Sequence, residues 1–359
     1  MKLCFLIDDY SAVGGIQRIV PLVASALSAD HEVHAVSMYQ QNGDNNRDFY
    51  GETVTLTTLI SGKKDYLKQA FPIVGLLKRY LKDHDIDILI ASSEMLVPYA
   101  WLASAALKIP FLCWTHTPAL SYDETFLQRP FKWLAVRKAA SIVALTEKTK
   151  KEYQDKYHNR NIVVIPNPVD PKLMKDVSYR SDSKRIVSVG RICYQKYYEK
   201  LVEVAAIVLK ENRDWTWDIC GDGNERENIE ELIKNNGLED RLILKGNVSD
   251  MYDRYREYGL QVMTSRFEGF PMTLLEGMAN GLPLVAFDVN GVAEVIKDGY
   301  NGYLIEAFDE KKMAERIDDL IKNEELRRTF SDNNVELRNK YSIGYAIERW
   351  NELFAKVKK

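Results

Sequence analysis

Residues 260–287 read LQVMTSRFEGFPMTLLEGMANGLPLVAF. Two short apolar runs, Leu260–Thr264 and Pro283–Phe287, enclose Met272–Asn280, a stretch whose apolar residues follow a helical period. Apolar runs that alternate with helices predict βαβ units, whose parallel strands are covered on both faces of the sheet. Pro271 stands at the expected helix start, where its missing N–H would have no partner in any case. This stretch therefore predicts one βαβ unit of a parallel sheet.

The same alternation extends from this unit towards both ends of the chain. The other strands that we predict are Leu3–Asp8, Glu32–Met38, Val54–Leu59, Ile86–Ser92, Pro110–Thr115, Ser141–Leu145, Ile162–Pro166, Arg185–Gly190, Trp215–Cys220, Arg241–Leu244 and Gly302–Ile305. The other predicted helices are Gln17–Leu27, Tyr66–Lys82, Pro98–Leu107, Phe126–Lys138, Glu147–Tyr157, Glu199–Lys210, Arg226–Asn235, Glu310–Lys322, Glu324–Lys340 and Ile343–Lys358. The pattern predicts an α/β fold made of two doubly wound, Rossmann-like domains in tandem.

The boundary between the two predicted domains lies in a polar stretch that contains prolines. We expect an N-terminal domain over residues 1–170, a linker over 171–184 and a second domain over 185–342. The final helix, about 343–359, is expected to pack back on the first domain. Open parallel sheets bind ligands at the carboxyl ends of their strands. Two such domains that face each other predict an active site in the cleft between them.

The composition excludes several classes of protein. The chain has 359 residues, 46% hydrophobic and 28% charged, which rules out wholesale disorder. A formal net charge of −3 gives no overall positive field, so we expect no nucleic-acid partner. The four cysteines are far apart and have no metal-ligand spacing, which predicts buried thiols in a reducing compartment. The amino terminus lacks the pattern of an export signal, and prolines interrupt the apolar stretch 95–114, so we expect a cytoplasmic protein without a transmembrane segment.

A pair of glycines, Gly14-Gly15, lies between the first predicted strand and the first helix. Glycines allow the backbone to approach a ligand closely, and the start of the following helix offers free N–H groups to an anion. A tight turn explains the pair equally well. On the sequence alone, this loop is a candidate binding site and no more.

Two cations, Arg191 and Lys196, follow the first strand of the second half. At the carboxyl end of a strand they suit a diphosphate that gains negative charge as it leaves, because arginine offers a fork of donors and lysine a point charge. The alternative is a pair of solvated surface cations. Their position favours a role in ligand binding.

Two glutamates, Glu268 and Glu276, stand eight positions apart. The first lies in a glycine-containing loop and the second lies inside the helix that begins near Pro271. The free amides of the first helical turn can meet a phosphate, and a carboxylate about one turn further along can accept both hydroxyls of a ribose. The alternative is that both are ordinary glutamates on a helix surface.

In their order and spacing, these motifs resemble those of the retaining glycosyltransferases of family four, which have the GT-B fold. The matching stretches cover almost the whole chain and are Gly14-Gly15, Pro166–Asp170, Val189–Arg191 with Lys196, Gly221–Gly223, Glu268 with Glu276, and Gly291–Ile296. The resemblance implies a hexosyltransferase that moves a hexose or N-acetylhexosamine from a UDP-sugar to a glycan or lipid-linked acceptor. It further implies bacterial surface-polysaccharide synthesis as the setting, and neither a metal ion nor another cofactor.

The resemblance also assigns roles to single residues. The implied catalytic residues are His116, facing the reacting carbon from the acceptor side, together with Glu268, Arg191 and Lys196. Arg191 and Lys196 would bind the donor diphosphate, and Glu276 would hold the ribose. The other residues implied in donor binding are Gly14 and Gly15, Asn247 and Val248 near the base, Gly269 and Phe270 with Glu268 at the sugar, and Pro271, Met272, Thr273 and Leu274 at the phosphate.

Retention of the anomeric configuration limits the mechanism. A double displacement needs a carboxylate nucleophile beneath the sugar, and no carboxylate of the first domain stands out for that role. The resemblance implies attack on the same face instead, with the leaving phosphate oxygen accepting the proton of the acceptor hydroxyl. The chain departs from the family at Tyr197, where a glycine is usual, so we expect the loop to run differently there.

Two other functions stay open on the sequence. One is a non-transferring GT-B enzyme, such as a UDP-N-acetylhexosamine 2-epimerase, and the other is a non-catalytic GT-B-like partner subunit. In addition, Tyr66–Lys82 and Arg129–Lys138 mix bulky apolar side chains with cations. That mixture is typical of a helix resting on an anionic membrane, and equally of an ordinary amphipathic helix. Peripheral contact with the inner face of the plasma membrane is therefore a hypothesis.

Overall fold

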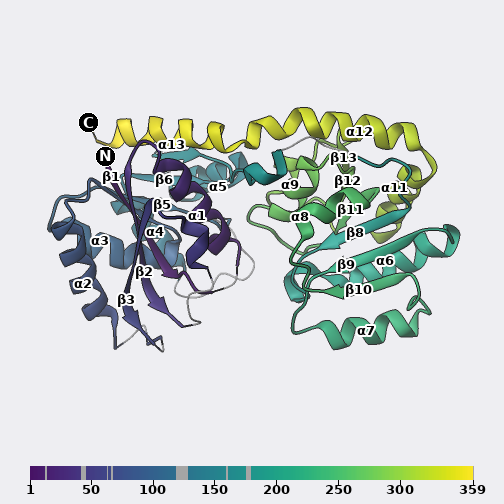
Figure 1. The fold of residues 1–359 in the computed structure, drawn as a ribbon, viewed down its shortest axis with the longest axis horizontal. Helices are drawn as coiled ribbons and strands as arrows, with labels where there is room; N and C mark the ends of the chain where they lie inside the picture. The colour runs from purple at the N-terminus through teal and green to yellow at the C-terminus, as the bar shows by residue number, and fades with distance from the viewer. Residues whose placement is uncertain are drawn as a thin grey trace. The chain divides into compact units, whose positions relative to one another are not determined.

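The computed structural model of the chain describes residues 1–12, 14–41, 46–62, 64–65, 68–118, 128–158, 161–174 and 179–358. The chain divides into two compact units (Figure 1). Unit 1 consists of Met1–Pro168 and Ile343–Lys359, and unit 2 consists of Val169–Ser342. The last helix of unit 1 therefore comes from residues that follow the whole of unit 2 in the sequence.

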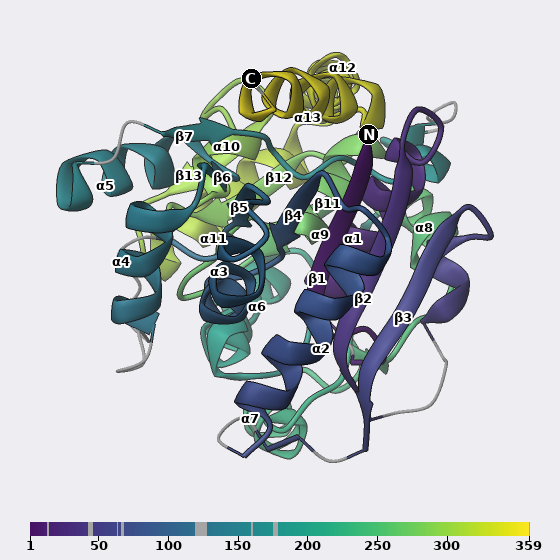
Figure 2. The ribbon, with the colours of Figure 1, turned by 90° about the vertical axis from the view of Figure 1, so that its left-hand side faces the viewer.

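The core of unit 1 is a seven-stranded sheet in the order β3-β2-β1-β4-β5-β6-β7 (Figure 2). Its strands are β1 (Lys2–Asp9), β2 (Glu32–Gln40), β3 (Val54–Ser61), β4 (Ile88–Ala91), β5 (Phe111–Trp114), β6 (Ser141–Ala144) and β7 (Ile162–Val164). All neighbouring strands are parallel. The chain adds strands first on one side of β1 and then, from β4 onward, on the other. The loops after β1 and β4 therefore occupy the ligand-binding position of an open sheet.

The helices of unit 1 are α1 (Ile16–Leu27), α2 (Ala70–Asp83), α3 (Val97–Ala105), α4 (Gln128–Lys138), α5 (Glu147–Tyr157) and α13 (Ile343–Val357). The last of them packs on the sheet through Trp350, which is fully buried. Its ring lies edge to face with Phe5 of β1 at 6.4 Å and with Trp114 of β5 at 5.1 Å. Aromatic rings bury large apolar areas, so these contacts attach the end of the chain firmly to unit 1.

Unit 2 contains a six-stranded parallel sheet in the order β10-β9-β8-β11-β12-β13. Its strands are β8 (Arg185–Val189), β9 (Thr216–Cys220), β10 (Leu242–Gly246), β11 (Leu260–Met263), β12 (Leu284–Phe287) and β13 (Gly302–Ile305). Its helices are α6 (Tyr198–Glu211), α7 (Arg226–Asn235), α8 (Met251–Arg254), α9 (Met272–Ala279), α10 (Val292–Val295), α11 (Glu310–Lys322) and α12 (Glu324–Leu337). Here the strand order reverses between β8 and β11, so the loops after these two strands hold the ligand-binding position.

The two sheets confirm the predicted fold class, and every predicted strand is present to within a few residues. Helices α8 and α10 were not predicted, because four residues are too short to show a helical period. Tyr66 and Phe126, where two predicted helices begin, lie outside the described residues. Within the described ranges, α2 begins at Ala70 and α4 at Gln128.

The apolar stretch 95–114 contributes to a short 3₁₀ turn, to α3 and to β5. Across the described part of the chain, no helix has the length and apolar character that crossing a membrane requires. The four cysteines are free thiols, and Cys4, Cys113 and Cys220 are buried.

Candidate active site

The loop after β8 in unit 2 is fixed by close backbone contact with the loop after β9. A Cβ on Gly221 would stand 2.0 Å from the carbonyl oxygen of Gly190, and one on Gly223 would stand 2.0 Å from that of Ile192. Real Cβ atoms do not approach this closely, so the contact requires glycine at both places. The packing of the two loops determines the backbone position of Arg191, which lies between Gly190 and Ile192.

Lys196 and Glu268 form a largely buried ion pair. The lysine Nζ lies 2.6 Å from the glutamate Oε1, and only 15% and 7% of the two side chains are exposed. The hydroxyl of Ser265 donates to the same Oε1 at 2.7 Å. Nε2 of Gln195 lies 3.5 Å from the other carboxylate oxygen, Oε2. Breaking such a pair would leave one buried charge uncompensated, which is strongly destabilising.

The turn that carries Lys196 is held by the loop after β11. The guanidinium carbon of Arg266 lies 3.2 Å from the ring centre of Tyr197 and 4.3 Å from that of Tyr194. Its Nε also donates to the carbonyl of Tyr194 at 3.0 Å. The hydroxyl of Thr264 donates to the carbonyl of Lys196 at 3.1 Å. These cation–π contacts and hydrogen bonds fix the lysine backbone relative to the loop that bears its carboxylate partner.

Tyr197 has a left-handed backbone, with φ 53° and ψ 48°. A glycine adopts this conformation freely, whereas an L-residue with a Cβ is strained by about 1–2 kcal/mol. Contacts of the tyrosine ring with Arg266 and, at 5.6 Å between ring centres, with Phe308 help to offset that strain. Tyr197 thus adopts the backbone conformation that a glycine would favour, and the expectation that this loop departs from the path usual in the family stays a prediction.

The start of α9 is open to an anion. Pro271 is its N-cap residue, and no side chain caps the helix. Helix geometry leaves the amides of Thr273 and Leu274 without an intrahelical acceptor, and the helix dipole is positive at this end. One turn further, the buried Glu276 accepts a hydrogen bond from the hydroxyl of Tyr255 at 2.9 Å. Burial, reinforced by the charge of Glu276, raises the pKa of Tyr255 well above its usual range, so the phenol keeps its proton.

The other candidates of unit 2 lie along the same edge of the sheet. The predicted site residues of unit 2 all follow the carboxyl ends of its strands, in loops or in the helices that come next. They are Arg191, Lys196, Asn247, Val248, Glu268, Gly269, Phe270, Pro271, Met272, Thr273, Leu274 and Glu276. Arg191 and Asn247 are exposed and Val248 is half-buried. Gly291, with φ 83°, approaches this group so closely that a Cβ there would stand 2.7 Å from the carbonyl oxygen of Gly269.

In unit 1, Gly14 and Gly15 lie at the start of α1, after β1. Neither has a positive φ, so a turn conformation reserved for glycine does not explain them. Apart from Gly15 and its own neighbours along the chain, no described atom lies within 4 Å of where a Cβ of Gly15 would stand, and no side chain caps α1. The start of α1 can therefore meet an anion with its free amides.

His116 lies just beyond β5 of unit 1. Its ring packs against Trp114 at 4.7 Å between ring centres. Its Nε2 is buried and has no hydrogen-bond partner among the described residues. Burial lowers the pKa of His116 to about 3, so the imidazole is neutral near pH 7. It can exchange a hydrogen bond with a ligand hydroxyl, but it carries no positive charge.

Several residues of these networks were missed in the sequence. Ser265 and Arg266 stand beside Glu268, and only their place in that motif could have indicated them. Tyr255, the partner of Glu276, precedes it by 21 positions and carries no signal. Glu94 of unit 1, a buried carboxylate just after β4, was also missed.

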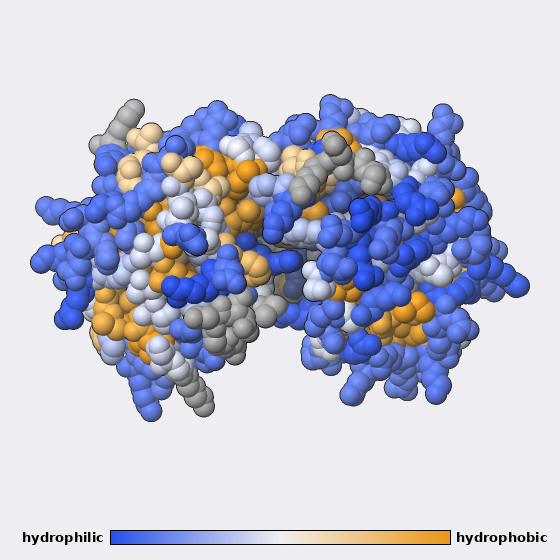
Figure 3. Space-filling view, in the orientation of Figure 1, coloured by the Kyte–Doolittle hydropathy of each residue, from blue (hydrophilic) through white to orange (hydrophobic). Residues whose placement is uncertain are grey.

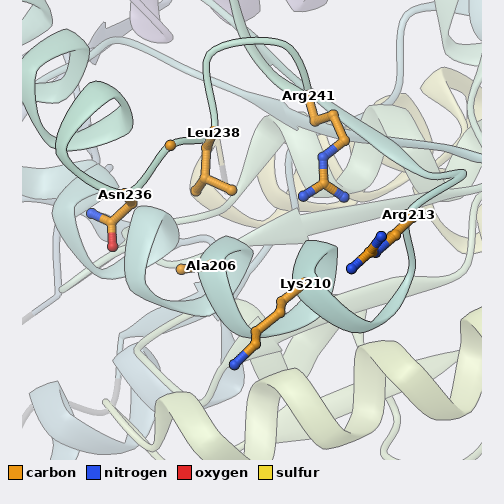
Figure 4. Close-up of a pocket in the computed structure, with 7 residues that line it drawn as sticks. Ala206, Lys210, Arg213, Asn236, Leu238 and Arg241 are labelled. Carbon is orange, nitrogen blue, oxygen red and sulfur yellow. The ribbon is translucent and has the colours of Figure 1, made fainter.

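A groove in unit 2 lies away from these candidates. It has a volume of about 500 Å³ and is lined in part by Lys210, Arg213 and Arg241 (Figure 4). Arg213 and Arg241 precede β9 and β10, so the groove lies at the amino ends of these strands. The candidate residues lie at the opposite edge of the sheet.

The arrangement in unit 2 suits a phosphorylated ligand. Lys196 and the uncapped start of α9 both provide positive potential, and Arg191 is exposed on the neighbouring loop. The carboxylate of Glu276 can accept hydrogen bonds from a pair of hydroxyls. Within the described ranges, no three His, Cys, Asp or Glu side chains are grouped so that they could hold a metal ion.

Comparison with known proteins supplies the family. The model for "Glycosyl transferases group 1" matches residues 169–336, and that for "Glycosyltransferase Family 4" matches residues 13–173. An uncharacterized glycosyltransferase of Haemophilus influenzae is 31% identical over 97% of this chain and 98% of its own. The amylovoran biosynthesis glycosyltransferase AmsD of Erwinia amylovora is 28% identical over 98% of this chain and 99% of its own. The crystal structure of Anabaena HepE in complex with UDP-glucose superimposes with a TM-score of 0.85 at 19% identity, covering 99% of this chain and 100% of HepE.

The two family models match stretches that overlap only at residues 169–173, one over most of unit 1 and the other over most of unit 2. The likeness to HepE extends over nearly the whole fold. The chain thus belongs to the group 1, family-four glycosyltransferases, a retaining hexosyltransferase family of the GT-B fold, as its motifs predicted.

Proposed function

We propose that this enzyme transfers a hexose or N-acetylhexosamine from a UDP-sugar to a glycan or lipid-linked acceptor in bacterial surface-polysaccharide synthesis. The single observation that supports the donor site is the Lys196–Glu268 pair beside the uncapped start of α9, with Glu276 one turn further. UDP has the groups that fit these features, namely a diphosphate and a ribose diol. The AmsD relative is named for amylovoran biosynthesis, and the HepE crystal holds UDP-glucose.

In this proposal the protein itself stabilises the leaving nucleotide. Lys196 and Arg191 neutralise charge on the diphosphate, and the amides of Thr273 and Leu274 bind one of its phosphates. Glu276 accepts hydrogen bonds from the ribose hydroxyls, while Tyr255 fixes the orientation of its carboxylate. The interactions of Lys196, Arg191 and the two amides with the diphosphate strengthen as the bond to the sugar breaks, because the negative charge on the diphosphate grows.

We assign Glu268 two roles, one for each of its carboxylate oxygens. Oε1 holds Lys196 and Ser265, so it orients the cation that binds the diphosphate. Oε2, which Nε2 of Gln195 approaches at 3.5 Å, would also accept hydrogen bonds from hydroxyls of the transferred sugar, and the amides of Gly269 and Phe270 would contact the same sugar. The glutamate thereby links the position of the sugar to the position of the cation at its phosphate.

We propose that the sugar is transferred on the same face. The bond between the anomeric carbon and the phosphate oxygen breaks, the acceptor oxygen bonds to that carbon from the same side, and the phosphate oxygen takes the acceptor proton. The protein contributes by positioning, with neutral His116 contacting a hydroxyl of the sugar. NMR of the product should show the anomeric configuration of the donor. An inverted product or a trapped glycosyl–enzyme would contradict this mechanism.

We also propose that unit 1 contacts an anionic membrane, where a lipid-linked acceptor would lie. On α2, Phe71 is 85% exposed and Leu76 is also exposed, next to the exposed Lys78 and Arg79. Trp133 on α4 is exposed as well. Figure 3 shows apolar surface over α2, with hydrophilic residues around it. Apolar side chains flanked by cations bind the interface of anionic bilayers.

Flotation with phosphatidylglycerol vesicles tests the membrane contact. The chain should float with the vesicles at low salt, and Phe71→Ser combined with Lys78→Glu should abolish this. If the unmodified chain does not bind phosphatidylglycerol vesicles at low salt, the proposed membrane contact is contradicted. Vesicles of phosphatidylcholine alone serve as the control.

Calorimetric titration with UDP, UDP-glucose, UDP-galactose and UDP-N-acetylglucosamine, with and without EDTA, tests the donor site. We expect at least one of these ligands to bind equally well in EDTA. Glu276→Ala should weaken binding at least about tenfold, since hydrogen bonds to a charged group contribute about 1.5–3 kcal/mol. The matched control is Glu231→Ala, an exposed glutamate on α7. No binding of any nucleotide, or binding that EDTA abolishes, would contradict the proposal.

A further inference from the structure

Glu94 is a buried carboxylate that neither the sheet packing nor the proposed chemistry explains. It follows β4 at the switch point of the unit 1 sheet and is 4% exposed. Its Oε1 accepts hydrogen bonds from two threonine hydroxyls, Thr117 at 2.7 Å and Thr115. A buried charge is costly unless such partners surround it. Both donors flank a single residue, His116.

Lys132 of α4 secures the same segment from another element. It is fully buried, and its Nζ donates to the carbonyl of Pro118 at 2.8 Å. A buried ammonium group is as costly as a buried carboxylate. Two buried charges, Glu94 and Lys132, are thus both bound to residues 115–118. A turn with only a structural task would not need charged anchors, because apolar packing would hold it at lower cost.

We propose that Glu94 is a positioning residue, which fixes the turn Thr115–Thr117 and thereby the imidazole of His116. This inference rests on the proposed function, in which His116 contacts the transferred sugar. Glu94 itself does not react, because its Oε1 is already shared by two donors and its side chain has almost no exposed surface. Lys132 acts as the second anchor by holding the residue that follows the turn.

Replacements of Glu94 separate positioning from reactivity. Glu94→Gln keeps an oxygen that can accept from both threonines, so turnover should stay within about threefold of the unmodified enzyme. Glu94→Ala removes the acceptor, and turnover should fall tenfold to about a hundredfold, the effect of displacing a catalytic contact by about 1 Å. KM for the donor should change less than kcat. Thr117→Val removes one of the two hydrogen bonds and should give an intermediate loss.

The matched control for the threonine is Thr57→Val. Thr57 lies in β3 of the same unit, and its hydroxyl hydrogen-bonds that of Tyr80 at 3.3 Å. Turnover of this variant should not change. Initial rates of UDP release from UDP-glucose, UDP-galactose or UDP-N-acetylglucosamine provide the measurement, with water as the acceptor.

A double-mutant cycle tests whether Glu94 acts through His116. In a His116→Ala background, Glu94→Ala should lower turnover little further, because the group that it positions is already gone. Fully additive losses would overturn the proposal. So would a Glu94→Gln variant as inactive as Glu94→Ala, because the carboxylate itself would then be required.

NMR of the histidine rings tests the positioning without any turnover. The chain has five histidines, so their ring signals can be assigned by substitution. The ring of His116 should not titrate between pH 5 and 8 in the unmodified protein, and it should titrate there once Glu94→Ala frees the turn. If the His116 ring of Glu94→Ala does not titrate between pH 5 and 8, the positioning role is overturned, even if UDP release is normal. If no donor releases UDP while the ring behaves as expected, the proposed function fails and the positioning stands.

Discussion

Removing the two charges of the Lys196–Glu268 pair, singly and together, should separate their effect on stability from their effect on activity. Lys196→Met leaves the carboxylate of Glu268 buried, with Ser265 and the distant Gln195 as its donors. Glu268→Gln leaves the ammonium group of Lys196 without its counter-charge. The double variant replaces both charges by neutral side chains of similar size.

The structure sets the expected magnitudes. Breaking a buried pair costs about 3–5 kcal/mol. Lys196 keeps 15% of its side chain exposed, which places the loss in Lys196→Met near the lower end, at about 3 kcal/mol. For a unit of this size that is a fall in Tm of about 6–12 °C. The double variant should lie within about 1 kcal/mol of the unmodified protein, because replacing both charges of a buried pair is often nearly neutral.

Activity should not follow stability. Lys196→Met should lower kcat about a hundredfold or more, since a charge that develops on the diphosphate loses its partner. The double variant should be equally inactive although its stability has recovered. Urea unfolding followed by tryptophan fluorescence, together with the rate of UDP release, supplies both readouts. A double variant no more stable than the single ones, or Lys196→Met with nearly normal kcat, would refute the reasoning.

Three further predictions concern single residues. Tyr255→Phe should raise the Kd for UDP severalfold, and less than Glu276→Ala does, because it removes only the donor that orients the carboxylate; calorimetry on both variants measures this. Burial lowers the pKa of His116 to about 3 in the folded protein, whereas the value in the unfolded chain is about 6.5. Below about pH 6.5 the imidazole is therefore protonated only in the unfolded chain, and the free energy of unfolding should be lower by about 2 kcal/mol at pH 5. Urea unfolding at pH 7.5 and pH 5 should show this loss, and His116→Asn should lack that part of it. Tyr197→Gly should be more stable than Tyr197→Ala by about 1 kcal/mol, because both variants lose the ring and only alanine is strained at a left-handed backbone; the reverse order in urea would refute the assigned conformation.

The fold could be predicted because each strand and each long helix has its own pattern of apolar residues in the local sequence. Strands such as Ile88–Ala91 and Leu284–Phe287 are buried at every position, so they appear in the sequence as short apolar runs between helices. The ends of the helices were predicted less accurately, because the last turn of a helix depends on contacts with residues outside the local sequence. The four-residue helices α8 and α10 could not be predicted, because four residues are too few to show a helical period.

Proximity of candidate site residues could be predicted from the sequence only where those residues lie in one motif. Glu268 and Glu276 were found together, because a loop and the next helix contain both. The pairing of Lys196 with Glu268 joins residues 72 positions apart, so the sequence could not show that they form an ion pair. The left-handed backbone of Tyr197 could not be predicted, because tyrosine disfavours it. Its contacts with Arg266 and Phe308, which accommodate that conformation, join residues far apart in the sequence.

Glu94 shows what the strand order adds to a sequence. In the linear chain it is one glutamate among many, and nothing near it resembles a catalytic motif. In the sheet, β4 lies between β1 and β5, so the residue that follows it stands beside the loops that carry Gly15 and His116. The chain pattern predicts that a fourth strand exists, but not on which side of β1 it pairs. That choice places Glu94 beside the threonines that flank His116, which is why the sequence alone could not indicate the positioning role that we propose for it.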